Sequence, residues 1–204
     1  EYRAALERTI DESDGLIRTF NALLMIARAE SGQARDNMTD FDAADVAQGI
    51  QELYEPLAED KGKAPAVAAE SAKIHGNREL VSQALANLVE NAIKYGQPVA
   101  TPLEMAADGP VNAAKPPDIL IEARREGSDV LLSVTDHGPG IPEPDRQRAV
   151  ERFVRLEASR TQPGSGLGLS LASAVATLHG GDLRLADSQP GLRVTLVIPS
   201  RGVE

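Results

Sequence analysis

The chain has 204 residues, of which 42% are hydrophobic and 25% charged, an ordinary balance for a globular protein that allows one medium-sized domain with a helical extension. The formal net charge of −10 argues against a nucleic-acid partner, because phosphate backbones require a basic surface. The absence of cysteine excludes disulfides and thiolate metal sites, and no apolar run approaches the roughly 20 residues that a membrane-spanning helix needs.

Residues 1–31 contain no proline and predict a single long helix. Apolar and small residues recur at alternating spacings of four and three, which forms a heptad seam, and a second row runs beside it. Two adjacent stripes favour a bundle helix whose partners lie outside this chain. The alternative is an amphipathic helix that packs on the rest of the domain. The seam contains Leu6, Ile10, Ser13, Ile17, Phe20, Leu24 and Ala27, and the second row contains Tyr2, Thr9, Leu16 and Leu23.

Two helices with capping residues follow a polar stretch. Residues 33–40 are polar and predict a linker. Asp42 is predicted to cap a helix that ends near Lys61, because its carboxylate can accept from the amides of the first turn. Asn77 is predicted to cap a second helix, which continues through Tyr95.

Residues 96–117 interrupt this pattern. Five prolines lie here among alanine and glycine, and no periodicity is sustained. A long loop without structure of its own is uncommon inside a compact domain, so we interpret this segment as a Pro/Ala-rich insertion.

Strand and helix patterns alternate over the remainder of the chain. Residues 167–178 predict a third helix of the domain that follows the long N-terminal helix, and it ends before two glycines. The order of elements predicts an α+β fold, a two-layer sandwich of a mixed β-sheet and about three helices, preceded by one long helix. The predicted strands are 64–69, 119–124, 130–135, 182–186 and 192–198.

Polar side chains gather on one face of the helix predicted to end at Tyr95. Asn87 and Asn91 lie one turn apart, and Lys94 follows at the next turn, opposite an apolar face that is expected to enter the core. Carboxamide oxygens are hard ligands, so this face can hold a hydrated Mg²⁺ and a polyphosphate. The alternative is an ordinary solvated face.

A carboxylate followed by glycines ends the strand predicted at 130–135. Asp136 can accept a hydrogen bond from an exocyclic amine, and Gly138 and Gly140 allow a flat base to approach the backbone. The alternative is a turn, since Asp-x-Gly-Pro-Gly is common turn chemistry. His137 is expected to be a solvent-facing loop residue.

A glycine-rich segment, 164–169, opens the third predicted helix and is preceded by a basic cluster. Successive glycines leave backbone N–H groups to point at anions, and the helix N-terminus adds a favourable dipole. Five arginines within fifteen residues of an acidic chain indicate attraction for phosphate. The alternative is ion pairing with Glu151 and Glu157. The arginines are Arg146, Arg148, Arg152, Arg155 and Arg160.

The three motifs 87–95 (NLVENAIKY), 136–142 (DHGPGIP) and 164–169 (GSGLGL) follow one another in the order found in bacterial sensor histidine kinases, whose ATP-binding domain this chain resembles. The resemblance implies a Bergerat-type ATP-binding fold over residues 38–201, with the insertion at 96–117. It also implies that residues 1–34 are the second helix of a dimerisation hairpin whose first helix is absent. Residues 143–165 would form a lid over the nucleotide.

The resemblance also implies a role for each motif residue, with ATP and Mg²⁺ as cofactors. Asn91 corresponds to the Mg²⁺ ligand, Lys94 to a phosphate contact and Tyr95 to a residue beside the nucleotide. Asp136 corresponds to the carboxylate that recognises the adenine amine. The predicted ATP-binding set is Asn87, Asn91, Lys94, Tyr95, Asp136, Gly138, Gly140, Ile141, Arg155, Arg160, Gly164, Ser165, Gly166, Leu167, Gly168 and Leu169.

Three of these residues are predicted to be catalytic: Asn87, Lys94 and Arg155. Arg155 is the first choice for the γ-phosphate and Arg160 the second. Hydrolytic members of the wider superfamily carry a Glu that activates water where this chain has Asn87, and an amide is no base. The substitution favours transfer to a protein over hydrolysis.

The chain has three histidines, His75, His137 and His179, and none lies where the family carries its phosphoacceptor. We therefore expect a fragment of a longer kinase, which binds ATP without phosphorylating itself. The resemblance implies transfer of the γ-phosphoryl of Mg-ATP to a histidine helix outside this chain, then to the receiver domain of a response regulator. The full-length protein is expected to be a homodimer anchored in the bacterial inner membrane, with this portion in the cytoplasm. The alternatives are a non-catalytic nucleotide-binding or interaction module that acts through the first helix, and an ATP hydrolase.

Overall fold

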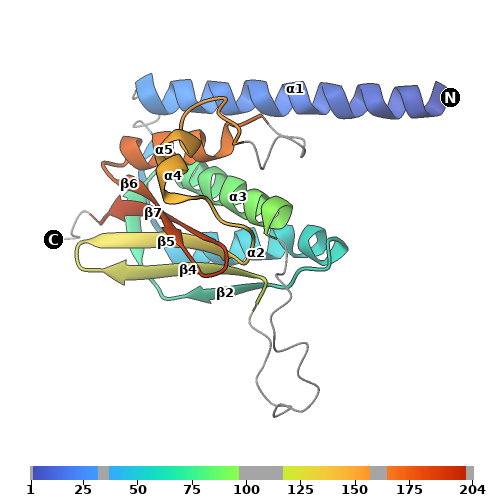
Figure 1. The fold of residues 1–204 in the computed structure, drawn as a ribbon. Coiled ribbons are helices and arrows are strands. Elements are labelled where there is room, and N and C mark those ends of the chain that lie inside the picture. Colours follow the sequence, from blue (N-terminus) through green and yellow to red (C-terminus); the bar gives the residue numbers. More distant parts are fainter. Residues whose placement is uncertain (1, 32–36, 97–116, 157–164, 201–204) are drawn as a thin grey trace, which may run out of the picture.

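The computed structural model describes residues 2–31, 37–96, 117–156 and 165–200. A five-stranded sheet in the order β2-β4-β5-β7-β6 forms one layer, and three helices, α2, α3 and α5, cover one of its faces (Figure 1). The predicted two-layer α+β fold is therefore confirmed. The elements are α1 (Tyr2–Ser31), β1 (Thr39–Asp42), α2 (Ala43–Asp60), β2 (Pro65–Ala69), β3 (Lys73–Gly76), α3 (Arg78–Tyr95), β4 (Ile119–Glu126), β5 (Asp129–Asp136), α4 (Glu143–Ala149), α5 (Gly168–Leu178), β6 (Asp182–Asp187) and β7 (Leu192–Pro199).

The two predicted capping residues begin α2 and α3. The Asp42 carboxylate accepts from the Ala44 amide at 2.9 Å, and the Asn77 carboxamide oxygen accepts from the Leu80 amide at 3.1 Å. Each cap satisfies an amide that the first helical turn leaves unpaired. The apolar face of α3 is buried as predicted, which fixes the direction in which its polar face points. That inward face consists of Val81, Leu85, Leu88, Val89 and Ala92.

The central strand of the sheet places one carboxylate at the helical layer. β5 pairs antiparallel with β4 on one side and with β7 on the other, while β2 pairs parallel with β4. Residues 130–134 of β5 are all buried, but Val130, Leu132 and Val134, which share one side of the strand, are the ones that belong to the hydrophobic cluster formed with the helices. Asp136 is next in this series, so its side chain leaves the strand end on the same side as the core.

A second, two-stranded sheet was missed in the sequence. β1 pairs antiparallel with β3, so Thr39 faces Gly76 and Asp42 faces Lys73. The prediction of a linker is thus wrong for residues 39 and 40. Each strand has only four residues and exposes charged side chains, so neither carries a run of alternating apolar residues.

The long N-terminal helix is confirmed as a single element. Its C-terminal part packs on α5, where Ile26 and Ala29 are buried, and its N-terminal end projects beyond the domain (Figure 1). The seam faces away from this contact, since Ile17, Phe20 and Leu24 are all exposed. The side chains of Leu6 and Ile10 lie outside the described residues. The assignment of residues 1–34 to a dimerisation hairpin stays a prediction.

Within the segments that the structure describes, no helix combines the length and the apolar composition required to cross a membrane. The insertion predicted at 96–117 falls almost entirely outside the described residues. Gly96 ends α3 by donating its amide to the Ala92 carbonyl at 2.9 Å.

His179 links the end of α5 to the start of α3. Its Nε2 accepts from the Asn77 amide at 3.0 Å, and its Nδ1 lies 2.7 Å from the Val175 carbonyl oxygen, to which it donates. This pair of contacts requires the neutral ring with the proton on Nδ1. The ring also lies against Gly76, where a Cβ would come within 2.6 Å of His179 Cδ2.

Lowering the pH is expected to destabilise the fold through His179. Burial lowers the pKa of His179 below its usual 6.5, although the bond to Val175 opposes this shift. As pH falls below 6.5, the unfolded chain takes up this proton before the folded chain does, so stability decreases, by at most about 1.4 kcal/mol per pH unit. Urea unfolding between pH 5 and 8 measures the slope, which His179→Asn should reduce. The exposed His75→Asn control should retain it, and equal slopes in all three proteins would contradict this account.

Candidate functional site

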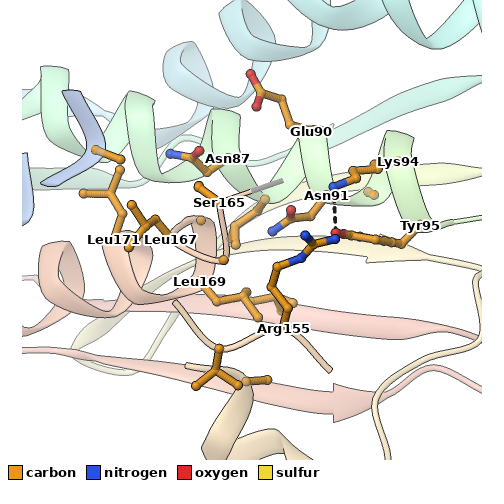
Figure 2. A pocket seen from close by; sticks show the side chains of 18 of the residues that line it. Asn87, Glu90, Asn91, Lys94, Tyr95, Arg155, Ser165, Leu167, Leu169 and Leu171 are labelled. Atoms are coloured by element: carbon orange, nitrogen blue, oxygen red, sulfur yellow. Dashed lines mark hydrogen bonds between the residues drawn. The ribbon is translucent and has the colours of Figure 1, made fainter. Parts of the chain in front are cut away.

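A cavity of about 1100 Å³ lies between α3, α5 and the end of β5, and α1 contributes part of its wall. Figure 2 shows side chains of the first and third motifs around this space, and residues of the second motif line it as well. Of the predicted set, Gly138 is not in the lining, and Arg160 and Gly164 lie outside the described residues. The predicted residues in the lining are Asn87, Asn91, Lys94, Tyr95, Asp136, Gly140, Ile141, Arg155, Ser165, Gly166, Leu167, Gly168 and Leu169.

The polar face of α3 forms one side of the cavity. Asn87 donates from Nδ2 to the Gln83 carbonyl at 2.9 Å, which fixes the orientation of its carboxamide. Lys94 donates from Nζ to the Tyr95 hydroxyl at 2.7 Å (Figure 2). Both residues and Asn91 are half-buried, so this is not the freely solvated face of the alternative interpretation.

The start of α5 lies opposite Asn91. A Cβ on Gly168 would come within 3.1 Å of Asn91 Nδ2, so glycine allows the two helices to approach this closely. No side chain caps the N-terminus of α5 at Leu167. A helix N-terminus carries a partial positive charge, and here it faces carboxamide and ammonium groups. This end of the cavity suits a polyanion.

A carboxylate forms the other polar feature of the cavity. Asp136 Oδ1 accepts from the Gly138 amide at 2.7 Å, and the Leu192 amide also donates to this carboxylate. Burial raises the pKa of Asp136, while these two bonds and the charges of His137 and Lys63 oppose the rise. A half-buried carboxylate of this kind accepts hydrogen bonds from a ligand amine.

Glycines pack tightly around Asp136. A Cβ on Gly138 would lie 2.6 Å from the Tyr95 carbonyl oxygen, and Gly140 has φ +70. Gly191, which the sequence did not indicate, would place a Cβ 1.8 Å from the Asp136 carbonyl oxygen and has φ +115. Gly138 therefore allows the β5 end to approach the end of α3, while Gly140 and Gly191 allow the segment after β5 to approach the start of β7.

The arginines predicted to attract phosphate divide into two groups. Arg146 donates to the Ile141 carbonyl at 3.0 Å, Arg148 pairs with Asp145 at 3.5 Å, and Arg152 pairs with Glu30 of α1. These three arginines have structural partners. Among the described residues, none of these partners is Glu151, with which the alternative interpretation paired them. Arg155 alone of the described arginines lines the cavity, and its side chain extends toward Tyr95 (Figure 2).

Several residues around the cavity were not expected. His137 is half-buried, with Nδ1 3.3 Å from the Asp118 carbonyl oxygen, so the prediction of a solvent-facing side chain is wrong. Glu90 lines the cavity and accepts from the Tyr54 hydroxyl at 2.6 Å. Lys63 is buried behind Asp136 and donates to carbonyls of α3. α1 adds Leu16, Thr19, Asn21, Ala22 and Met25 to the wall.

The donor set limits the way a metal is held. Among the described residues, no group of three or more His, Cys, Asp or Glu side chains is arranged to hold a metal ion. Mg²⁺ commonly takes one or two protein oxygens and completes its shell with phosphate oxygens and waters. The Asn91 carboxamide, in the narrow space that Gly168 leaves open, fits this mode.

Sequence comparisons relate this chain to a known protein family. Residues 76–202 match the family described as histidine kinase-, DNA gyrase B-, and HSP90-like ATPase. The sensor protein IrlS of Burkholderia pseudomallei is 32% identical over 197 residues, which is 96% of this chain and 38% of that protein. The chain thus spans well under half the length of this relative.

Two solved structures share the fold. The mycobacterial sensor histidine kinase MprB is 26% identical, with a TM-score of 0.60 over 81% of this chain and 99% of that one. Full-length ShkA, in complex with AMPPNP, is 23% identical, with a TM-score of 0.72 over 97% of this chain and 38% of that one.

Proposed function

Since this chain belongs to the family of histidine kinase-, DNA gyrase B-, and HSP90-like ATPases, we propose that its cavity binds Mg-ATP and that it forms the ATP-binding catalytic region of a bacterial sensor histidine kinase. The observation that carries the proposal is the convergence of three motifs, distant in sequence, on one cavity of about 1100 Å³. The ATP analogue in the ShkA complex supports a nucleotide as the ligand of this fold.

The adenine base occupies the end of the cavity at Asp136. The carboxylate accepts from the exocyclic amine, which distinguishes adenine from a base with a carbonyl at that position. Gly140 allows the base to lie close to the backbone. Aliphatic side chains supply the contact surface for the ring, namely Val134, Ile141, Leu171, Leu192 and Val194.

The triphosphate occupies the opposite end, between α3 and α5. Asn91 holds Mg²⁺, which neutralises phosphate charge when it is bound. Lys94, on α3, contacts phosphate oxygens, and Arg155, in the segment after α4, contacts the γ-phosphate. The N-terminus of α5 adds its dipole. Together these groups position the phosphoryl group and stabilise its charge, which is most of what catalysis of phosphoryl transfer requires.

The γ-phosphoryl group passes to a histidine on a helix outside this chain. An imidazole nitrogen of the acceptor attacks the γ-phosphorus, the bond to the β–γ bridging oxygen breaks, and ADP leaves. Asn87 lines the cavity where a hydrolase would need a general base, and its carboxamide cannot take a proton from water. This disfavours the ATP hydrolase alternative.

The wider assembly is part of the same proposal. The phosphohistidine would supply the receiver domain of a response regulator. The full-length protein would be a homodimer through the hairpin to which α1 belongs, with its membrane anchor in the inner membrane and this region in the cytoplasm. The net charge of −10 disfavours a nucleic-acid partner.

Calorimetric titration with AMPPNP tests the binding step. We expect saturable binding that Mg²⁺ strengthens, because Asn91 and the phosphates share the ion. With [γ-³²P]ATP, the chain alone should remain unlabelled, and adding an acceptor hairpin from a related kinase should yield acid-labile label on the hairpin. A folded chain that binds no AMPPNP would overturn the proposal and favour an interaction module that acts through α1.

A further inference from the structure

Lys63, in the turn between α2 and β2, is buried although no motif includes it. Its exposed fraction is 7%, and it is the one lysine or arginine among the buried residues of the described segments. Burying a lysine is costly unless its ammonium group is paired, so its surroundings indicate what it stabilises.

The ammonium group of Lys63 binds the last turn of α3. Nζ donates to the Ile93 carbonyl and, at 3.4 Å, to the Ala92 carbonyl. The Ala92 carbonyl also accepts from the Gly96 amide, but the last carbonyls of a helix generally lack partners within the helix, and a cation there complements the dipole. The same turn places Lys94 and Tyr95 in the cavity lining, so Lys63 holds this turn from the side away from the cavity.

Asp136 lies on the other side of this contact. The end of α3 and the end of β5 are in close contact, since a Cβ on Gly96 would lie 2.9 Å from Asp136 Cβ. Asp136 and Asp118 are the carboxylates that favour the charged form of Lys63. Asp118 already accepts from the Ala64 amide at 3.0 Å.

We propose that Lys63 is a positioning residue for nucleotide recognition, which holds the last turn of α3 against the β5 end, where Asp136 accepts from the adenine amine. This inference rests on the proposed function. Lys63 does not line the cavity, so it acts through Asp136 and α3 rather than by touching the nucleotide.

The charges around the pair agree with this role. Burial lowers the pKa of Lys63, and Asp136 and Asp118 oppose that shift, while Lys61 reinforces it. Burial raises the pKa of Asp136, and His137 and Lys63 are the two charged side chains that oppose the rise. Removing the Lys63 charge should therefore raise the pKa of Asp136 further.

The test measures the affinity for AMPPNP as a function of pH in the wild type and in two variants. Lys63→Met removes both the charge and the donor, whereas Lys63→Gln removes the charge and keeps an N–H donor for the helix end. Lys61→Met is the matched control, because it removes a charge from an exposed residue of the same turn. Dividing each variant's Kd by that of the wild type at the same pH cancels the titration of the nucleotide phosphates.

Lys63→Met should raise the Kd ratio more than Lys63→Gln does, because glutamine keeps a donor for the end of α3, and both ratios should rise as pH falls, because the pKa of Asp136 is higher without the Lys63 charge. Lys61→Met should give a flat ratio near one. A folded Lys63→Met variant whose Kd ratio stays near one at every pH would overturn the inference. Absence of AMPPNP binding by the wild type would instead contradict the proposed function, so the two failures are distinguishable.

Discussion

Asp136→Ala is expected to weaken the binding of AMPPNP by at least about 30-fold, because truncating one partner of a buried, charge-assisted hydrogen bond costs about 2–5 kcal/mol. The variant removes the acceptor for the adenine amine, and among the described residues that line the cavity the remaining carboxylate is Glu90, which is bound to Tyr54. The effect should be smaller for a purine nucleotide without the amine. Calorimetric titration with both nucleotides measures this difference.

The control for this variant is Asp129→Ala, at the opposite end of the same strand and outside the cavity. Asp129→Ala should bind AMPPNP as the wild type does. Asp136→Ala also leaves the amides of Gly138 and Leu192 without their acceptor. The melting temperatures of both variants therefore establish that they fold. A folded Asp136→Ala protein with unchanged affinity would show that the base lies elsewhere.

Asn91→Ala is expected to abolish the gain in AMPPNP affinity that Mg²⁺ provides. It should also reduce phosphoryl transfer by about 100-fold or more, the usual scale for losing one preorganised electrostatic contact. Asn91 is the described carboxamide that faces the N-terminus of α5, where Gly168 holds the two helices together. Titrations with and without Mg²⁺ give the first quantity, and label transfer to an acceptor hairpin gives the second.

Gln83→Ala provides the matched control, because Gln83 is a carboxamide on the same face of α3, two turns toward the N-terminus, and also lines the cavity. It should retain the Mg²⁺ effect. If the two variants responded equally to Mg²⁺, Asn91 would not be the metal ligand, and the cation would be held by the phosphates and water.

Local signals account for the parts of the fold that were predicted. α3 has a side-chain cap at Asn77, a buried face with helical periodicity and a glycine after its last residue. α5 likewise ends at two glycines. β1 and β3 lack such signals, because four residues with exposed charges are strand only through their mutual pairing. α4 was expected only as part of a lid, since seven residues within an arginine cluster show no apolar face.

The site divides in the same way. The residues within the three motifs could be predicted, because each motif is local and carries its own chemistry. Gly191, Lys63 and the wall from α1 could not, because tertiary contacts alone bring them to Asp136 and the cavity. A lysine three residues after the end of a helix normally indicates an exposed turn, so only the structure shows that Lys63 is buried.

The wall that α1 contributes makes the placement of this helix and the occupancy of the cavity thermodynamically reciprocal. Thr19, Ala22 and Met25 line the same space as Asn91 and Asp136. A slide of α1 by one residue moves that wall by about 1.5 Å, a large step for close-packed contacts. If two placements of α1 differ in their affinity for the nucleotide by some factor, the bound nucleotide shifts the equilibrium between these placements by the same factor.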